Sequence, residues 1–159
     1  MKGAAAAEAV TKLGLEVAVD LDAYPGRLAR INNGTPRPII VHQHMLDNHP
    51  DLVELFLEQT LRAADWAALN PSDLKPIIAH ETFSGMEGVE TAYRNNFYRS
   101  LHPDLSEDRI EMLRIQGHFL WVHGFIESPV DIDKWVCRGP LDAVMKRRAM
   151  AETRTDELA

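Results

Sequence analysis

Three histidines with close spacing, His42, His44 and His49, are the first residues of the chain that could do metal chemistry. Neutral imidazole is a common metal ligand, and three such rings could hold zinc or copper. His42 and His44 are two residues apart, so on a strand both would point to one face. Asp47 is the nearest acidic residue that could complete the set. Because residue 44 falls where the strand should already turn toward a helix, we expect polar groups at a strand end. The three histidines are only weak metal candidates.

The segment just before these histidines carries side chains suited to an anion. Asn and Thr side chains and loop amides can donate hydrogen bonds, and a guanidinium can grip a sulfonate or carboxylate with two parallel contacts. Loops carry binding residues more often than their share of the chain. The alternative is a loop whose polar groups satisfy its own turns. The ligand-binding candidates are Asn32, Asn33, Thr35, Arg37 and His42.

No self-sufficient catalytic centre is visible in the sequence. His80-Glu81 begins like a zinc-protease motif, but Ser84 stands where the second histidine is required. Neither residue that directly flanks Cys137 is a histidine or a lysine, the side chains that would lower the pKa of a catalytic thiol. No Ser-His-Asp order and no G-x-S-x-G turn occurs. We therefore predict no catalytic residue and no cofactor, and the chain is not expected to be an enzyme by itself.

The composition excludes several classes of protein. The chain has 159 residues and a net charge of -7, which argues against a nucleic-acid partner. The densest basic run, residues 146–148, is expected to be the solvated last turn of a helix. No apolar run reaches the roughly 18 residues needed to span a membrane. Glu8 interrupts the alanine-rich start, so no signal peptide is recognised and the chain as written is expected in the cytoplasm.

The elements that must position these side chains are mainly helices. Two apolar, valine- and isoleucine-rich runs, 15–20 and 38–42, are predicted to be strands. One short turn is expected over 131–136. Two strands cannot form a stable sheet alone, so the prediction is a helix-rich α/β chain with an incomplete sheet. Helical signals cover residues 2–13, 51–69, 71–81, 84–95, 106–123 and 140–149.

Two helices carry more specific signals. Ser84 and Glu87 have the spacing of a capping box, in which two side chains satisfy the first amides of a helix. The helix over 51–69 is apolar except for one narrow charged stripe, so we expect it to be covered on most sides. The stripe consists of Glu54, Glu58, Arg62 and Asp65.

Several short segments follow one another in a specific order: Leu21–Pro25, Asn33–Ile39, Ala63–Pro71, Leu101–Leu105 and Asp131–Val136. Their order resembles that in the type-2 periplasmic solute-binding proteins of ABC importers for nitrate, sulfonates, taurine and thiamine precursors. The resemblance covers roughly residues 2 to 145 and corresponds to the C-terminal half of such a protein. It implies two α/β lobes joined by crossing strands, with a ligand held between them.

The resemblance also implies a division of the chain and a role. Residues 1–35 would be the end of the second lobe, 36–145 the crossover strand and the C-terminal helices of the first lobe, and 146–159 a polar, frayed tail. The role would be a solute-binding component for a small anionic organic or sulfur-containing solute, docking the membrane subunits of an importer. The location would be the periplasm, or the cell surface as a lipoprotein.

Two alternatives stay open. One branch of the same family resembles aromatic sulfinate desulfinases, whose catalytic thiol lies in a part that this chain does not match, so the chain would be a fragment of such an enzyme. The other alternative is a standalone helical interaction protein. An unpaired strand edge would then allow a homodimer, because such edges invite pairing.

Overall fold

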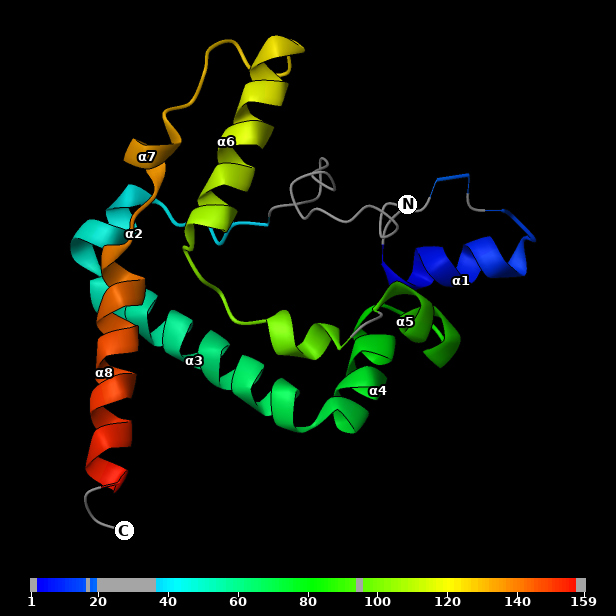
Figure 1. Cartoon of the computed structure of the whole chain (residues 1–159), viewed down its shortest axis with the longest axis horizontal. Coiled ribbons are helices and arrows are strands. Elements are labelled where there is room, and N and C mark those ends of the chain that lie inside the picture. Colours follow the sequence, from blue (N-terminus) through cyan, green and yellow to red (C-terminus); the bar gives the residue numbers. More distant parts are fainter. Residues whose placement is uncertain (1–2, 17, 20–36, 94–95, 157–159) are drawn as a thin grey trace. The chain divides into compact units, whose positions relative to one another are not determined.

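The computed structural model describes residues 3–16, 18–19, 37–93 and 96–156, and every regular element in these ranges is a helix (Figure 1). Most helices of the sequence prediction are confirmed within a few residues. The short helices α2 and η3 were not predicted. The elements are α1 (Ala4–Lys12), α2 (Gln43–Asn48), α3 (Pro50–Leu69), α4 (Pro71–Glu81), α5 (Met86–Ala92), η3 (Phe97–Ser100), α6 (Glu107–Val122), α7 (Ile132–Trp135) and α8 (Gly139–Asp156).

The predicted α/β fold class, a partial type-2 periplasmic-binding-protein fold, is wrong for this structure. The described residues of the run 15–20 and the whole of the run 38–42 are irregular, and no strand occurs in the described ranges. The apolar side chains of these runs, such as Val19 and Ile40, are exposed. A strand exists only where a neighbour pairs with its backbone amides and carbonyls. Valine and isoleucine content alone therefore does not make these segments strands.

The chain divides into two compact units. The first holds residues 1–20 and 59–103, and the second holds 21–58 and 104–159. Helix α3 contributes its first nine residues to the second unit and the rest to the first. The lobe boundaries that the resemblance implied, at residues 35 and 145, stay a prediction. The tail that we expected to fray is helical as far as Asp156.

The first unit is held by a close approach of α1 and α5. Ala4 and Val89 are buried almost completely. A Cβ on Gly88 would lie 2.5 Å from the Ala4 carbonyl oxygen and 2.9 Å from the Glu8 Cβ, so only glycine fits at this position. The small residues of both helices thus allow their backbones to approach, and dispersion contacts replace bulky side chains.

The start of α5 is satisfied from a distant part of the chain instead of by the predicted capping box. Gly85, the residue that precedes the helix, donates its N–H to Glu8 Oε2 of α1 at 2.6 Å. Ser84 instead shares a hydrogen bond of 2.8 Å with Thr82 through their hydroxyls. The side-chain contact with Lys12 and the Gly85 N–H lower the pKa of Glu8. A carboxylate is favourable here because a helix N-terminus is positively polarised.

In the second unit, two ion pairs join α8 to the first part of α3. Arg147 contacts Glu54, and Arg148 Nη1 lies 3.0 Å from Glu58 Oε1. The run 146–148 is therefore not simply a solvated last turn, and two of the four residues of the predicted charged stripe of α3 face another helix. Val144, one turn earlier on α8, is fully buried.

The prediction that α3 is covered on most sides is wrong for the described structure. One side is buried through Leu57, Leu61, Ala64 and Ala67. The opposite side is exposed and is apolar at both ends of the helix, with Gln59 and Arg62 at its centre. The helix is thus apolar on two faces, of which the described chain covers one.

No helix among the described residues is both long and apolar enough to cross a membrane.

Substituting Gly88 tests the close approach of α1 and α5. We expect Gly88→Ala to destabilise the first unit by about 2 kcal/mol, because the new methyl group meets the Ala4 backbone. Gly117→Ala is the matched control: its Cβ would lie 3.7 Å from Ile132 Cδ1, an ordinary contact, and alanine should stabilise α6 by about 0.5 kcal/mol. Residue-resolved amide hydrogen exchange reports each unit separately. Unchanged protection of α1 and α5 in Gly88→Ala would contradict the close approach.

Candidate functional site

Two ligand-binding candidates, Arg37 and His42, lie within the described residues. Both are on one irregular segment, residues 37–42, which leads into α2. His42 takes an extended conformation, and its carbonyl accepts hydrogen bonds from the amides of Met45 (2.9 Å) and Leu46 (3.4 Å). The backbone of His42 thereby starts the helix. Arg37, five residues earlier, is exposed and takes part in an interaction of its own. Asn32, Asn33 and Thr35 lie outside the described residues. The binding roles of these three residues, and those of Arg37 and His42, stay predictions.

The polar side chains of α2 bind to one another along the helix. Asn48 Nδ2 lies 3.1 Å from His44 Nδ1 and also donates to the His44 carbonyl at 2.9 Å. The rings of His44 and His49 meet edge to face with their centroids 6.3 Å apart. Asp47, the acidic residue that could have completed a metal site, accepts a hydrogen bond from Gln43. Each of these groups therefore serves the local helix.

No metal centre is formed by the part of the chain that the structure describes. Within it, no group of three His, Cys, Asp or Glu side chains is arranged to hold an ion. His42, His44 and His49 are close in sequence, but the helical turn over 43–48 replaces the strand that would have aligned the first two. Cys137 is exposed.

A histidine–carboxylate contact that sequence reasoning missed lies in the first unit. His102 Nε2 is 2.8 Å from Asp65 Oδ1 of α3, and both side chains are about 40% exposed. If Nε2 carries the proton, the carboxylate fixes that tautomer and leaves Nδ1 as an acceptor. Such a pair can accept a proton from a group placed at Nδ1. The two residues are 37 positions apart, so no local pattern could have indicated the contact.

Arg114 of α6 is saturated by carboxylates and joins α7 to α6. Its guanidinium contacts Asp133 (2.6 Å), Glu111 (3.0 Å) and Glu107. Hydrogen bonding to Asp133, and then to the two glutamates, raises the pKa of Arg114. The same guanidinium lowers the pKa of Asp133. An arginine with three acidic partners has a structural role and is a poor candidate for holding an external anion.

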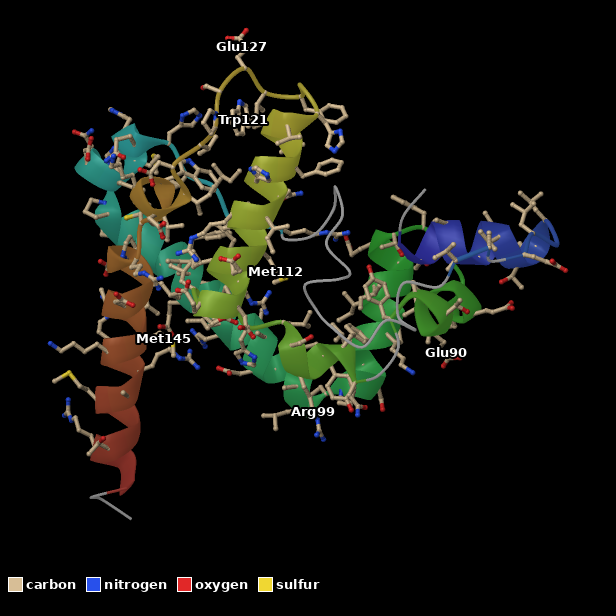
Figure 2. The ribbon with its side chains drawn as sticks, turned by 45° about the horizontal axis from the view of Figure 1, so that its top comes forward. Glu90, Arg99, Met112, Trp121, Glu127 and Met145 are labelled. Carbon is tan, nitrogen blue, oxygen red and sulfur yellow. The ribbon has the colours of Figure 1, made fainter. Side chains whose placement is uncertain are left out.

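The three tryptophans of the chain are partly exposed. Trp66, Trp121 and Trp135 each expose between 41% and 47% of their surface. Figure 2 shows Trp121 near the end of α6, whereas Met112, two and a half turns earlier, is almost completely buried. Near Trp121, the rings of Phe119 and Phe125 stack with centroids 6.3 Å apart. The C-terminal end of α6 therefore presents aromatic surface.

Asp104 fixes the start of α6. Its Oδ1 accepts hydrogen bonds from the Ser106 amide (3.0 Å) and hydroxyl (2.6 Å), and its Oδ2 accepts one from Arg109 Nε (2.8 Å). Partial burial is the largest single influence on the pKa of Asp104 and raises it. The bonds from Ser106 and Arg109 together outweigh burial and leave this pKa below its ordinary value. The ionised carboxylate thus orders the loop that leads into the helix.

Comparisons with known proteins give one structural likeness of interest. No protein-family model matches the chain, and no curated protein matches it. The chain is similar to the crystal structure of a cysteine-to-serine mutant of DszB in complex with biphenyl-2-sulfinic acid, with a TM-score of 0.60 and 21% sequence identity. DszB is a desulfinase of the periplasmic-binding-protein-like fold. The likeness covers 65% of this chain, which spans only 30% of the DszB chain, and it shows a shared backbone arrangement alone.

The depressed pKa of Asp104 predicts an acid-sensitive α6. Because the folded-state pKa lies below the unfolded one, the stabilisation is present above about pH 4 and is lost as the pH falls through the folded value. We expect Asp104→Asn to lower stability by about 0.5 kcal/mol at pH 6 and to have almost no effect near pH 2.5. Urea unfolding at both pH values measures this difference. Glu127→Gln, at an exposed position in the loop after α6, is the control and should change little at either pH. An equal loss in Asp104→Asn at both pH values would contradict the role of the ionised carboxylate.

Proposed function

We propose that this chain is the helical part of a desulfinase-like protein and that it contributes to binding an aromatic sulfinate. The observation that carries the proposal is the backbone likeness to DszB over 65% of the chain, because that structure holds biphenyl-2-sulfinic acid. The likeness favours the desulfinase-like alternative over the importer role. The order of short segments along the sequence also supports the proposal, since the segments that resemble the wider family include Asn33–Ile39 and Leu101–Leu105.

The reaction of a desulfinase sets what such a protein must provide. In sulfinate hydrolysis the carbon–sulfur bond breaks, the carbon gains a proton from water, and the sulfur leaves as hydrogen sulfite. The protein must hold two sulfinate oxygens and deliver a proton to the carbon. Arg37 has the planar, two-pronged donor set that suits the oxygens. His42, on the same irregular segment, can supply a further hydrogen bond.

Binding, and not turnover, is the part of this activity that we propose for the chain as given. The serine–carboxylate contact among its described residues, Ser106 with Asp104, orders the start of α6, and the chain spans 30% of DszB. A small ligand held by one short segment is not enclosed, so we expect weak affinity, with a Kd on the order of 1 mM.

The importer role is the second candidate. It rests on the order of the segments along the sequence that resembles solute-binding proteins for nitrate, sulfonates, taurine and thiamine precursors. Its ligand would be a small anion that lacks the biphenyl group. The two candidates therefore differ in which anion the same segment prefers.

Titration of the ¹⁵N-labelled chain with biphenyl-2-sulfinate, taurine and nitrate separates the candidates. We expect biphenyl-2-sulfinate to shift the amide signals of residues 37–48 and to bind most tightly of the three. Arg37→Ala should weaken binding about tenfold, the effect of losing a charge-assisted contact. Arg99→Ala, an exposed arginine in η3, is the control and should bind like the parent chain.

Three results would contradict the desulfinase-like proposal or its details. Preference for taurine or nitrate would favour the importer role. No shift with any of the three anions would remove both candidates for this chain. Release of sulfite by the chain alone would show that it carries the catalytic groups, contrary to a role limited to binding.

A further inference from the structure

The exposed face of α3 is apolar at both ends of the helix. Leu52 exposes 49% of its surface, Leu55 54%, Trp66 41% and Leu69 82%. These residues are additional to the apolar residues on the buried face of the same helix. Leaving four large side chains in water on a second face is costly, at roughly 25 cal/mol for each Å² that a partner could cover. Large apolar side chains gathered on one exposed helix face mark an interaction site.

The spacing on this face is that of a helix–helix seam. Because all of these residues belong to one continuous helix, helical geometry alone places them on one side. Steps of three and four residues keep the stripe straight along the helix, as in coiled coils. Its six positions, in order, are Leu52, Leu55, Gln59, Arg62, Trp66 and Leu69, all of them exposed.

We propose that this face binds the same face of a second copy of the chain, with the two α3 helices antiparallel. Such an interface is built from one patch used twice about a two-fold axis. With the axis at the middle of the helix, between residues 60 and 61, Leu52 meets Leu69 and Leu55 meets Trp66. Apolar side chains thus cover apolar side chains at both ends of the seam.

The centre of the seam selects the antiparallel arrangement. There, Gln59 of each copy meets Arg62 of the other, and the amide oxygen can accept a hydrogen bond from the guanidinium. A parallel pair would instead place Arg62 against Arg62, and like charges at close range are unfavourable. The sequence of the stripe is therefore complementary to itself in one direction and repulsive at its centre in the other.

The acidic residues beside the seam do not oppose this arrangement. Glu58 and Asp65 flank the stripe and would approach the other copy. Glu58 is already paired with Arg148 at 3.0 Å, and Asp65 is hydrogen-bonded to His102 at 2.8 Å. Arg148 thus compensates the charge of Glu58, and the Asp65 carboxylate is hydrogen-bonded within each copy.

The size of the seam sets the expected strength. A helix of 20 residues is about 30 Å long, so one helix face buries less than the roughly 800 Å² per partner of a standard interface. We therefore expect a reversible dimer with a Kd on the order of 10 µM. The strand edge that we first considered for dimerisation is not needed, and the described ranges contain no strand.

Sedimentation equilibrium of the full chain tests the dimer. We expect dimer to predominate at about 100 µM and Leu55→Lys to raise the Kd at least tenfold, because it places a charge in the apolar part of the seam. Ile77→Lys makes the same change at an exposed apolar residue of α4 and should leave the Kd unchanged. Circular dichroism should show equal helix content in all three proteins. A monomer at 200 µM, or equal weakening by both variants, overturns the proposal and assigns the face to another partner.

Disulfide trapping tests the direction of the seam. In a Cys137→Ser background, Leu52→Cys combined with Leu69→Cys should give a covalent dimer on mild oxidation. Leu52→Cys combined with Leu55→Cys is the control, since the antiparallel seam brings no two of its cysteines together. Equal trapping in both double variants would indicate parallel or random association and would overturn the antiparallel arrangement. Neither experiment depends on sulfinate binding.

Discussion

The structure depends on covering the apolar side chains of α3. A helix that is apolar on two opposite faces must find two coverings. The described chain supplies one of them through Leu57, Leu61, Ala64 and Ala67, of which the first belongs to the second unit and the others to the first. The α3 residues of each unit then carry further contacts: the ion pairs to α8 in the second unit and the hydrogen bond to His102 in the first.

Contacts between distant residues take over roles that nearby residues could have filled. Glu8 satisfies the Gly85 amide across 77 positions, although Ser84 lies next to that helix start. Arg148 reaches Glu58 across 90 positions. A polar group is most stabilising where its partner is already ordered, because less conformational entropy is lost on forming the contact. The packing of the helices provides that order, as the absence of room for a Cβ at Gly88 shows for α1 and α5.

The features relevant to function are an irregular segment with Arg37 and His42, a histidine held by a carboxylate, and unpartnered apolar surface. The likeness to DszB is a shared backbone arrangement over 65% of the chain, and a sulfinate-binding role for the irregular segment is our proposal. Saturation of Arg114 by three acidic residues removes a competing anion site from consideration. We propose that the exposed apolar residues of α3 bind a partner. Their symmetric spacing along the helix favours a second copy of the chain as that partner.

Most of the helices were predictable from the sequence because their signals are local. Gly14 and Gly124 follow α1 and α6 with positive φ, Asn70-Pro71 opens α4, and Asp131 caps the turn of α7 through the Lys134 amide. Only the tertiary structure decided that the described residues of the runs 15–20 and 38–42 form no strand, and it also decided the capping of α5, the ion pairs of α3 and the contact of His102 with Asp65. A strand and each of these contacts require a partner far away in the chain, and a valine-rich run or a lone histidine has the same local sequence whether or not that partner is present.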